Sequence, residues 1–190
     1  MKWKSIIKII IRFPILGGAT IPYLKAKERI NPDIKRWRSL NQTSFKNDYL
    51  ALLDLLTRHV EFRNIFYIRY RGAAHLKFLL PPLSSLYITC HNIGKGFFVQ
   101  HGFSTVITAK KIGDNFWVNQ QVTIGYTAKG SPTIGNNVRI GAGAIVVGDI
   151  VIGNNVTIAA GATVNMDVPD NSLVVPQKAR IIENHIVSKQ

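Results

Sequence analysis

The 190-residue sequence has a single cysteine, few acidic residues and no long uninterrupted apolar run. Because Cys90 has no partner in the chain, an intrachain disulfide is excluded, and a reducing compartment such as the cytoplasm is expected. The longest apolar stretch near the start is broken by Lys8 and Arg12. It therefore falls short of the roughly 20 apolar residues that span a bilayer.

The shortage of acidic residues leaves a formal net charge of +14, which is unevenly distributed. Residues 1–92 hold 16 Lys and Arg against 5 Asp and Glu, whereas residues 93–190 hold 8 against 5. A basic half predicts an anionic partner, either a phosphorylated cofactor or an anionic lipid surface. Nucleic acid is not expected as a partner, because no zinc-finger, RRM-like or helix-turn-helix signature accompanies the charge.

The first half of the chain reads as an α-helical, basic N-terminal region over residues 1–84. On a helix over residues 2–13, the basic residues form one stripe, a pattern typical of peripheral membrane contact. The alternative is a helix packed on its own protein or on a neighbouring subunit. Pro14, Gly17, Gly18 and Pro22 predict a loop, and apolar spacing predicts a helix over about residues 44–60.

The second half of the chain repeats an isoleucine or valine every six residues. The positions are Ile134, Ile140, Val146, Ile152, Ile158 and Val164. A fixed short period is typical of a solenoid, in which each rung buries its apolar face against neighbouring rungs. We expect a mainly β fold over residues 85–170, with three-sided coils of about 18 residues, followed by a C-terminal tail over 171–190.

The period slips in two places. Equivalent coil positions are Ile93, Ile112, Ile134 and Ile152, which are 19, 22 and 18 residues apart. This spacing predicts one extra residue near Ser104-Thr105, with Phe103 and Val106 pointing inward. It also predicts a protruding loop over residues 126–132, which carries Lys129.

One column of the stacked coils has a chemical character of its own. It reads His101, Gln120, Ala142 and Ala160 from one coil to the next. Since parallel strands lie about 4.8 Å apart, the last of these lies on the order of 14 Å from the histidine. Small side chains there predict a channel for a long, thin ligand whose reactive end reaches His101.

Four segments carry a resemblance to a known family: 94–102, 121–127, 140–144 and 179–182. Together they resemble the hexapeptide-repeat acyltransferases, in the serine acetyltransferase-like branch that includes bacterial polysaccharide O-acetyltransferases. The resemblance covers about residues 85–183. It implies a left-handed parallel β-helix, a homotrimer with active sites between subunits, and acetyl-CoA as co-substrate.

The resemblance also implies roles for single residues. His101 would be the general base, since an imidazole titrating near neutrality suits that role. Cofactor contacts would lie at Gly125, Thr127, Lys129, Ala142, Ala160, Lys178 and Arg180. Candidates for acceptor binding are His91, Asn119 and Gln120, with a surface or turn role as the alternative.

Two departures from authentic serine acetyltransferases concern the acceptor. No acid precedes the histidine at residues 86–89, and the loop at residues 126–130 holds no second histidine. The predicted function is therefore acetyl transfer to a sugar hydroxyl of a capsule, lipopolysaccharide or exopolysaccharide precursor. The alternatives are serine O-acetylation for cysteine biosynthesis and a non-catalytic β-solenoid. No metal is expected, because the coils contain only His101 and a zinc site needs about three clustered ligands.

Overall fold

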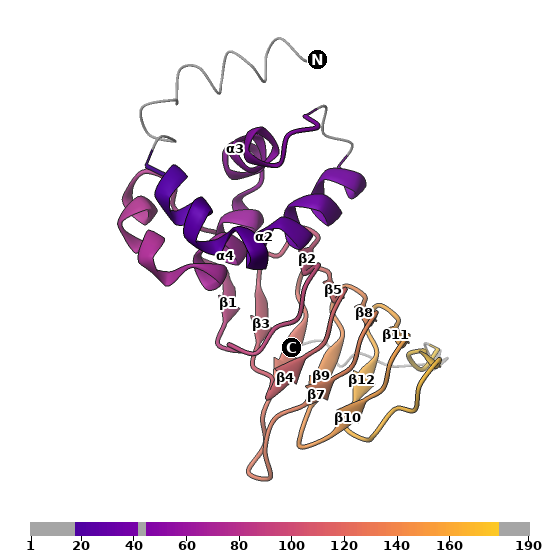
Figure 1. Cartoon of the computed structure of the whole chain (residues 1–190). Helices are drawn as coiled ribbons and strands as arrows, with labels where there is room; N and C mark the ends of the chain where they lie inside the picture. Colours follow the sequence, from indigo (N-terminus) through magenta and orange to yellow (C-terminus); the bar gives the residue numbers. More distant parts are fainter. Residues whose placement is uncertain (1–17, 42–44, 179–190) are drawn as a thin grey trace, which may run out of the picture.

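The computed structural model describes residues 18–41 and 45–178, which form a helical region followed by a parallel β-solenoid (Figure 1). The helical elements are α2 (Thr20–Leu40), α3 (Asp48–Arg58), α4 (Val60–Arg69) and the 3-10 helix η1 (Arg71–Phe78). The helix expected over residues 2–13 lies outside the described residues. Among the helices that are described, none has both the length and the apolar character needed to cross a membrane.

The solenoid is a left-handed parallel β-helix, as predicted, with three sheets that the chain visits in turn. The first sheet contains β1 (Leu86–Ile88), β3 (Thr105–Ile107), β6 (Thr123–Gly125), β9 (Ile145–Val147) and β12 (Thr163–Val164). The second contains β4 (Lys111–Ile112), β7 (Thr133–Ile134) and β10 (Val151–Ile152). The third contains β2 (Phe98–Val99), β5 (Trp117–Val118), β8 (Arg139–Ile140), β11 (Thr157–Ile158) and β13 (Leu173–Val174).

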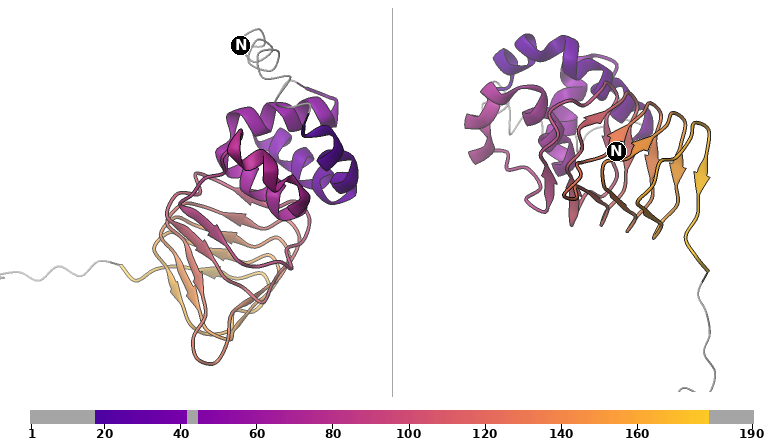
Figure 2. Two further views of the ribbon diagram at one scale, coloured as in Figure 1. Left: turned by 90° about the vertical axis from the view of Figure 1, so that its left-hand side faces the viewer. Right: turned by 90° about the horizontal axis from the view of Figure 1, so that it is seen from below.

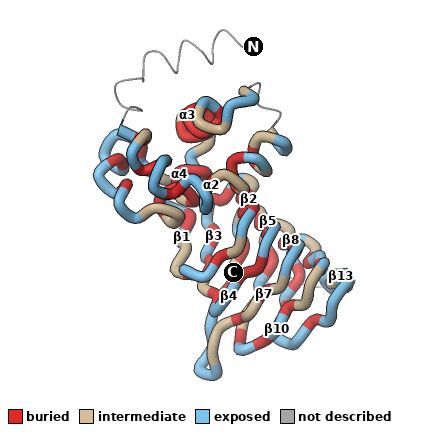
Figure 3. Tube along the Cα trace, viewed as in Figure 1, coloured by how far each residue is buried: buried red, intermediate tan, exposed pale blue. Residues whose placement is uncertain are grey.

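The strand register agrees with the coil positions read from the period. Ile93 lies beside Ile112, which pairs through Ile134 to Ile152. These side chains are buried, and the inward residues form a continuous core along the solenoid axis (Figure 3). Burying each such isoleucine or valine contributes about 1.5–3 kcal/mol. The solenoid also extends past the expected boundary at residue 170, because β13 pairs with β11.

The first slip in the period is larger than the spacing suggested. Ile107, not Val106, pairs with Ile124 and is fully buried, whereas Val106 is 38% exposed. Thr105 likewise takes the inward place expected for Phe103, which is 45% exposed. Two residues are therefore inserted before β3 and one is missing before β4. The net change is a gain of one residue, so the spacing did not show the insertion and the missing residue separately. Val106 and Ile107 also fit the inward pattern equally well.

The helical region differs from expectation at its start and at its middle. Pro22 lies in the first turn of α2 and not in a loop. It is tolerated there because the first N–H groups of a helix have no intrahelical acceptor. The helix expected over residues 44–60 begins at Asp48, where the Asn47 side chain accepts hydrogen bonds from two backbone N–H groups. It ends at Arg58, since His59 is extended and separates α3 from α4.

The helices cover the first coil of the solenoid and satisfy its free backbone groups (Figure 2). Asp33 of α2 is fully buried and pairs with Arg69 of α4 at 2.7 Å. The Asp33 carboxylate also accepts the Phe97 N–H at 2.8 Å, and Arg69 donates to the carbonyl oxygens of Ile93 and Gly94. Burial raises the pKa of Asp33, while Arg69 and the Phe97 N–H act in the opposite direction.

This ion pair predicts a large difference between two aspartate substitutions. Asp33→Ala should lower the free energy of unfolding by about 3–5 kcal/mol, because it leaves the buried Arg69 without its carboxylate. Asp149→Ala removes half of an exposed pair with Lys110, in which both side chains are at least 50% exposed, and serves as the control. Its effect should stay below about 1 kcal/mol. Urea unfolding of both variants checks this, and equal losses would contradict the role given to Asp33.

Candidate active site

His101 lies in a two-residue insertion at the corner between the third and first sheets. In the regular coils, Gly143 donates its N–H to Gln120 and Gly161 donates to Ala142. One coil earlier, Gln121 donates to Phe103. Phe103 therefore takes the place in the column that the sequence pattern assigned to His101. The inserted residues are His101 and Gly102, which interrupt the turn.

The insertion gives His101 an unusual backbone and an exposed side chain. Its φ is +63°, a left-handed conformation that costs a residue other than glycine roughly 1–2 kcal/mol. The following Gly102 has no room for a side chain, because an added Cβ would lie 2.6 Å from the Val99 side chain and 3.3 Å from Glu61. The close packing at Gly102 and the left-handed backbone at His101 together direct the imidazole away from the core.

His101 lines a pocket of about 240 Å³ between the helices and the first coil. The lining residues are Trp37, Leu40, Asn41, His59, Glu61, Phe98, Val99, Gln100, His101 and Trp117. Three of the rings form a cluster, in which Trp37 and Trp117 each pack at an angle against Phe98, with centroid distances of 4.6 and 4.7 Å. The pocket thus combines an aromatic wall with groups that form hydrogen bonds.

The helical region contributes five pocket residues, and its titratable ones are His59 and Glu61. The His59 ring packs edge-on against Trp37, and its Nε2 is buried with no hydrogen-bond partner among the described residues. Burial lowers the pKa of His59, and the charge of Arg58 acts in the same direction. Glu61 supplies the pocket's one carboxylate. No local signal marks either residue, because they lie 40 or more positions before His101.

Asn119 and Gln120 lie one coil above His101, at the same corner. The Asn119 side chain accepts a hydrogen bond from the Trp117 ring nitrogen at 2.9 Å, which fixes that ring in the pocket wall. Gln120 Oε1 is buried and accepts no hydrogen bond in the part of the chain that the structure describes. An amide oxygen without a donor is costly, so it is available to a hydroxyl group of a ligand.

Further along the same corner, the residues are small. Ala142 is half-buried and Ala160 is exposed. A Cβ added at the neighbouring Gly143 or Gly161 would meet no atom within 4 Å, so the space outside this corner is open. The corner therefore offers a narrow, unobstructed strip that leads away from the pocket.

The remaining cofactor candidates do not share this corner. Gly125 ends β6, and Thr127 and Lys129 lie in the loop that projects from the corner between the first and second sheets. Within one chain, the width of the first sheet separates that loop from His101. Lys178 is exposed beyond β13, and Arg180 lies outside the described residues.

His91 is not near His101 within the chain. It lies at the corner between the first and second sheets, where the Arg71 guanidinium is 2.9 Å from its Nε2. It lines two other pockets, neither of which contains His101. Within residues 18–41 and 45–178, no group of three or more His, Cys, Asp or Glu side chains could hold a metal ion.

Comparison with known proteins identifies the repeat. Residues 131–165 match the family described as bacterial transferase hexapeptide (six repeats). This part of the solenoid is therefore similar to bacterial transferase hexapeptide repeats. A 93-residue segment of the chain is 46% identical to the putative colanic acid biosynthesis acetyltransferase WcaB of Escherichia coli K12, and covers 47% of this chain and 57% of that protein. A 95-residue segment is 43% identical to a serine acetyltransferase of Helicobacter pylori, with 47% and 56% covered.

The likeness to solved structures extends beyond the solenoid into the helices. Soybean serine acetyltransferase aligns over 83% of this chain and 69% of its own, with 27% identity and a TM-score of 0.57. Serine acetyltransferase isoform 3 of Entamoeba histolytica aligns over 88% of this chain and 63% of its own, with 25% identity and a TM-score of 0.56. The chain spans little more than half the length of the curated relatives it matches.

The buried His59 predicts a loss of stability in mild acid. Its pKa in the folded protein lies below the ordinary value of 6.5, so protonation favours the unfolded chain as the pH falls below about 6.5. Between about pH 7.5 and about pH 5.5, the free energy of unfolding should fall more for the wild type than for His59→Gln. The exposed His75 provides the control substitution, His75→Gln. If both variants follow the wild-type pH profile, the burial of His59 has no such effect.

Proposed function

We propose that the protein is an O-acetyltransferase that uses acetyl-CoA as co-substrate and acetylates a sugar hydroxyl, with His101 as general base. The observation that carries the proposal is the inserted histidine at the mouth of an aromatic pocket, on a hexapeptide solenoid. The names of the matched relatives, a putative colanic acid biosynthesis acetyltransferase and serine acetyltransferases, support acetyl transfer as the reaction.

His101 would act on the acceptor hydroxyl. A neutral imidazole removes the proton of that hydroxyl as its oxygen attacks the thioester carbonyl, and then returns the proton to the departing sulfur. The co-substrate supplies the activated acetyl group. Since both substrates meet at one base, no covalent acyl-enzyme is needed. The exposed position of His101 at the pocket mouth suits contact with both substrates.

The pocket favours a sugar over serine as the acceptor. Serine carries a carboxylate, which proteins commonly bind with arginine or lysine. Among the described residues that line the pocket, none is an arginine or a lysine. Two tryptophans, the Gln100 and Asn41 side chains and the Glu61 carboxylate suit an uncharged ligand with several hydroxyl groups. Serine remains the alternative because Glu61 is able to pair with its ammonium group.

The open corner suits the thin pantetheine arm of acetyl-CoA. Ala142 and Ala160 leave the strip clear, and the exposed Lys178, which follows β13, would supply a positive charge for the phosphates. Gly125, Thr127 and Lys129, at a different corner, would reach the same cofactor only from a neighbouring subunit. We therefore propose a homotrimer in which each cofactor lies between two chains. Work on a lipid-linked glycan precursor at the inner face of the membrane would suit the basic N-terminal half.

The base is tested with His101→Asn. Asparagine adopts the left-handed conformation readily, so the variant should keep the wild-type melting temperature. Its kcat/KM should fall by roughly 10²- to 10⁴-fold, because no imidazole remains to remove the proton of the sugar hydroxyl. CoA release is measured with purified full-length protein against a panel of sugars and against serine. Unchanged turnover in the folded variant would refute the mechanism, and turnover with serine alone would refute the sugar acceptor.

The cofactor strip is tested with Ala160→Trp. An indole at this exposed corner should raise the KM for acetyl-CoA roughly tenfold, a loss of about 1.4 kcal/mol of binding, with little change in kcat. Val151→Trp provides the control, because Val151 is exposed at the same level of the solenoid on a different sheet. Equal effects of the two substitutions would argue against a cofactor strip at this corner.

A further inference from the structure

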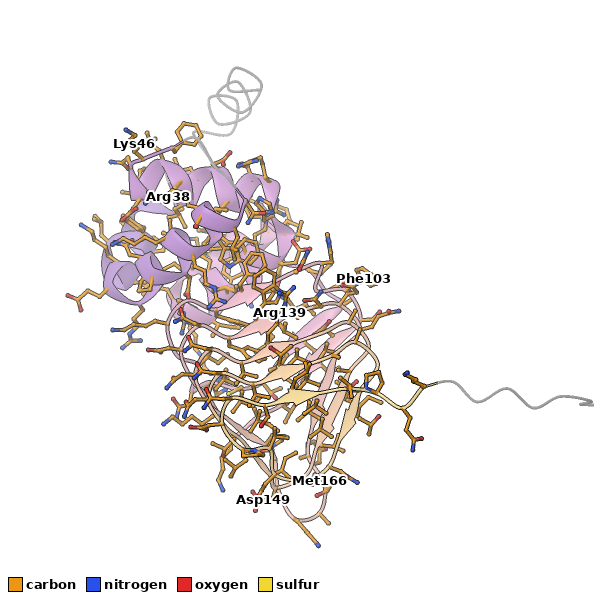
Figure 4. The ribbon with its side chains drawn as sticks, turned by 90° about the vertical axis from the view of Figure 1, so that its right-hand side faces the viewer. Arg38, Lys46, Phe103, Arg139, Asp149 and Met166 are labelled. Atoms are coloured by element: carbon orange, nitrogen blue, oxygen red, sulfur yellow. The ribbon has the colours of Figure 1, made fainter. Side chains whose placement is uncertain are left out.

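A second, open groove lies beside the His101 pocket on the outer face of the third sheet. It has a volume of about 270 Å³. Its lining residues are Arg36, Asn115, Trp117, Asn137, Val138, Arg139 and Thr157. Trp117 lines both cavities, so a ligand that leaves the His101 pocket over this ring enters the groove directly. Figure 4 shows Arg139 on this face, close beneath the helices.

Two positively charged residues, Arg36 and Arg139, line the groove. The Arg139 guanidinium lies over the Trp117 ring, 4.4 Å from its centroid. It forms no ion pair or side-chain hydrogen bond in the part of the chain that the structure describes. Arg36 donates one N–H to the Gly96 carbonyl oxygen at 2.8 Å, which holds it at the edge of the groove with donors to spare. Among the described residues, no aspartate or glutamate lines the groove.

The two asparagine side chains of the groove take part in hydrogen bonds within the protein. Asn115 donates its side-chain amide to Asn137, which in turn donates to Asn155, so these amides form a ladder along the solenoid. The charged donors that the groove offers to a ligand are the two guanidinium groups. A guanidinium matches the two oxygens of a carboxylate or phosphate, which it binds with paired, charge-assisted hydrogen bonds.

We propose, as an extension of the proposed function, that this groove binds an anionic group of the acceptor while the reacting hydroxyl lies at His101. Trp117 and Arg139 are paired in register, about 4.8 Å apart. The corner with the insertion lies about three residues beyond Trp117 in the strand direction, which adds a distance of roughly 10 Å. A disaccharide with an acidic sugar, or a sugar with a linked phosphate, spans such a separation. The acceptor is thus an acidic glycan or a phosphorylated glycan precursor.

The groove is tested with three acceptors that differ only in the substituent that one sugar carries. One is a trisaccharide that contains a hexuronic acid, the second is the same trisaccharide with its carboxyl group reduced to the alcohol, and the third carries a phosphate ester at that sugar. Arg139→Gln should raise the KM for a charged acceptor roughly tenfold or more, because a charge-assisted contact is lost. The KM for the reduced acceptor and for acetyl-CoA should stay unchanged. Whether the carboxylate or the phosphate form responds identifies the natural anion.

Lys111→Gln is the matched control, since Lys111 is an exposed residue on the second sheet and its loss changes net charge equally. The proposal is overturned if Arg139→Gln affects charged and reduced acceptors alike, if Lys111→Gln has the same effect, or if Arg139→Gln changes the oligomeric state. If the wild type acetylates no sugar at all, the proposed function has failed. Calorimetric titration with the uronic-acid trisaccharide then tests the groove separately, and binding that Arg139→Gln abolishes would still support it.

Discussion

The buried carboxylate of Asp33 joins the two halves of this molecule. A parallel solenoid leaves unpaired backbone groups at its first coil, and such an edge must be covered or satisfied. Asp33 and Arg69 together bind the N–H of Phe97 and the carbonyl oxygens of Ile93 and Gly94, while Trp37 donates to the Phe97 carbonyl. These contacts hold the helices against the coil that carries His101. The candidate acceptor pocket exists because of this attachment.

A regular solenoid offers no distinctive site, since each coil presents nearly the same surface as the next. Two inserted residues break that equivalence in the first complete coil. They place His101 outside the hydrogen-bonded column, in a left-handed backbone conformation. The packing of the surrounding core offsets the free-energy cost of that conformation. The corners beyond Gln120 carry the small residues Ala142 and Ala160 and stay open. Regular coils thus form a candidate path for the co-substrate, and the irregular one holds the proposed base.

The fold was largely predictable because burial in a solenoid depends on local spacing. Ile112, Ile134 and Ile152 were paired correctly from the six-residue period alone. The pattern failed where two adjacent residues, Val106 and Ile107, were both suited to an inward position, since an apolar period cannot distinguish them. Helix α2 was missed because Pro22 reads as a loop signal, yet the first turn of a helix accepts it.

The candidate site, like the fold, was predictable from the sequence only in part. The sequence by itself determined the solenoid and the small residues Ala142 and Ala160 at one corner, because each of these follows from the repeat. Only the tertiary structure brought His59, Glu61 and Trp37 beside His101, and aligned Arg36 with Arg139 next to the pocket. Contacts between a helical region and a solenoid depend on docking surfaces far apart in the chain. Such contacts follow no period, so the sequence pattern holds no record of them.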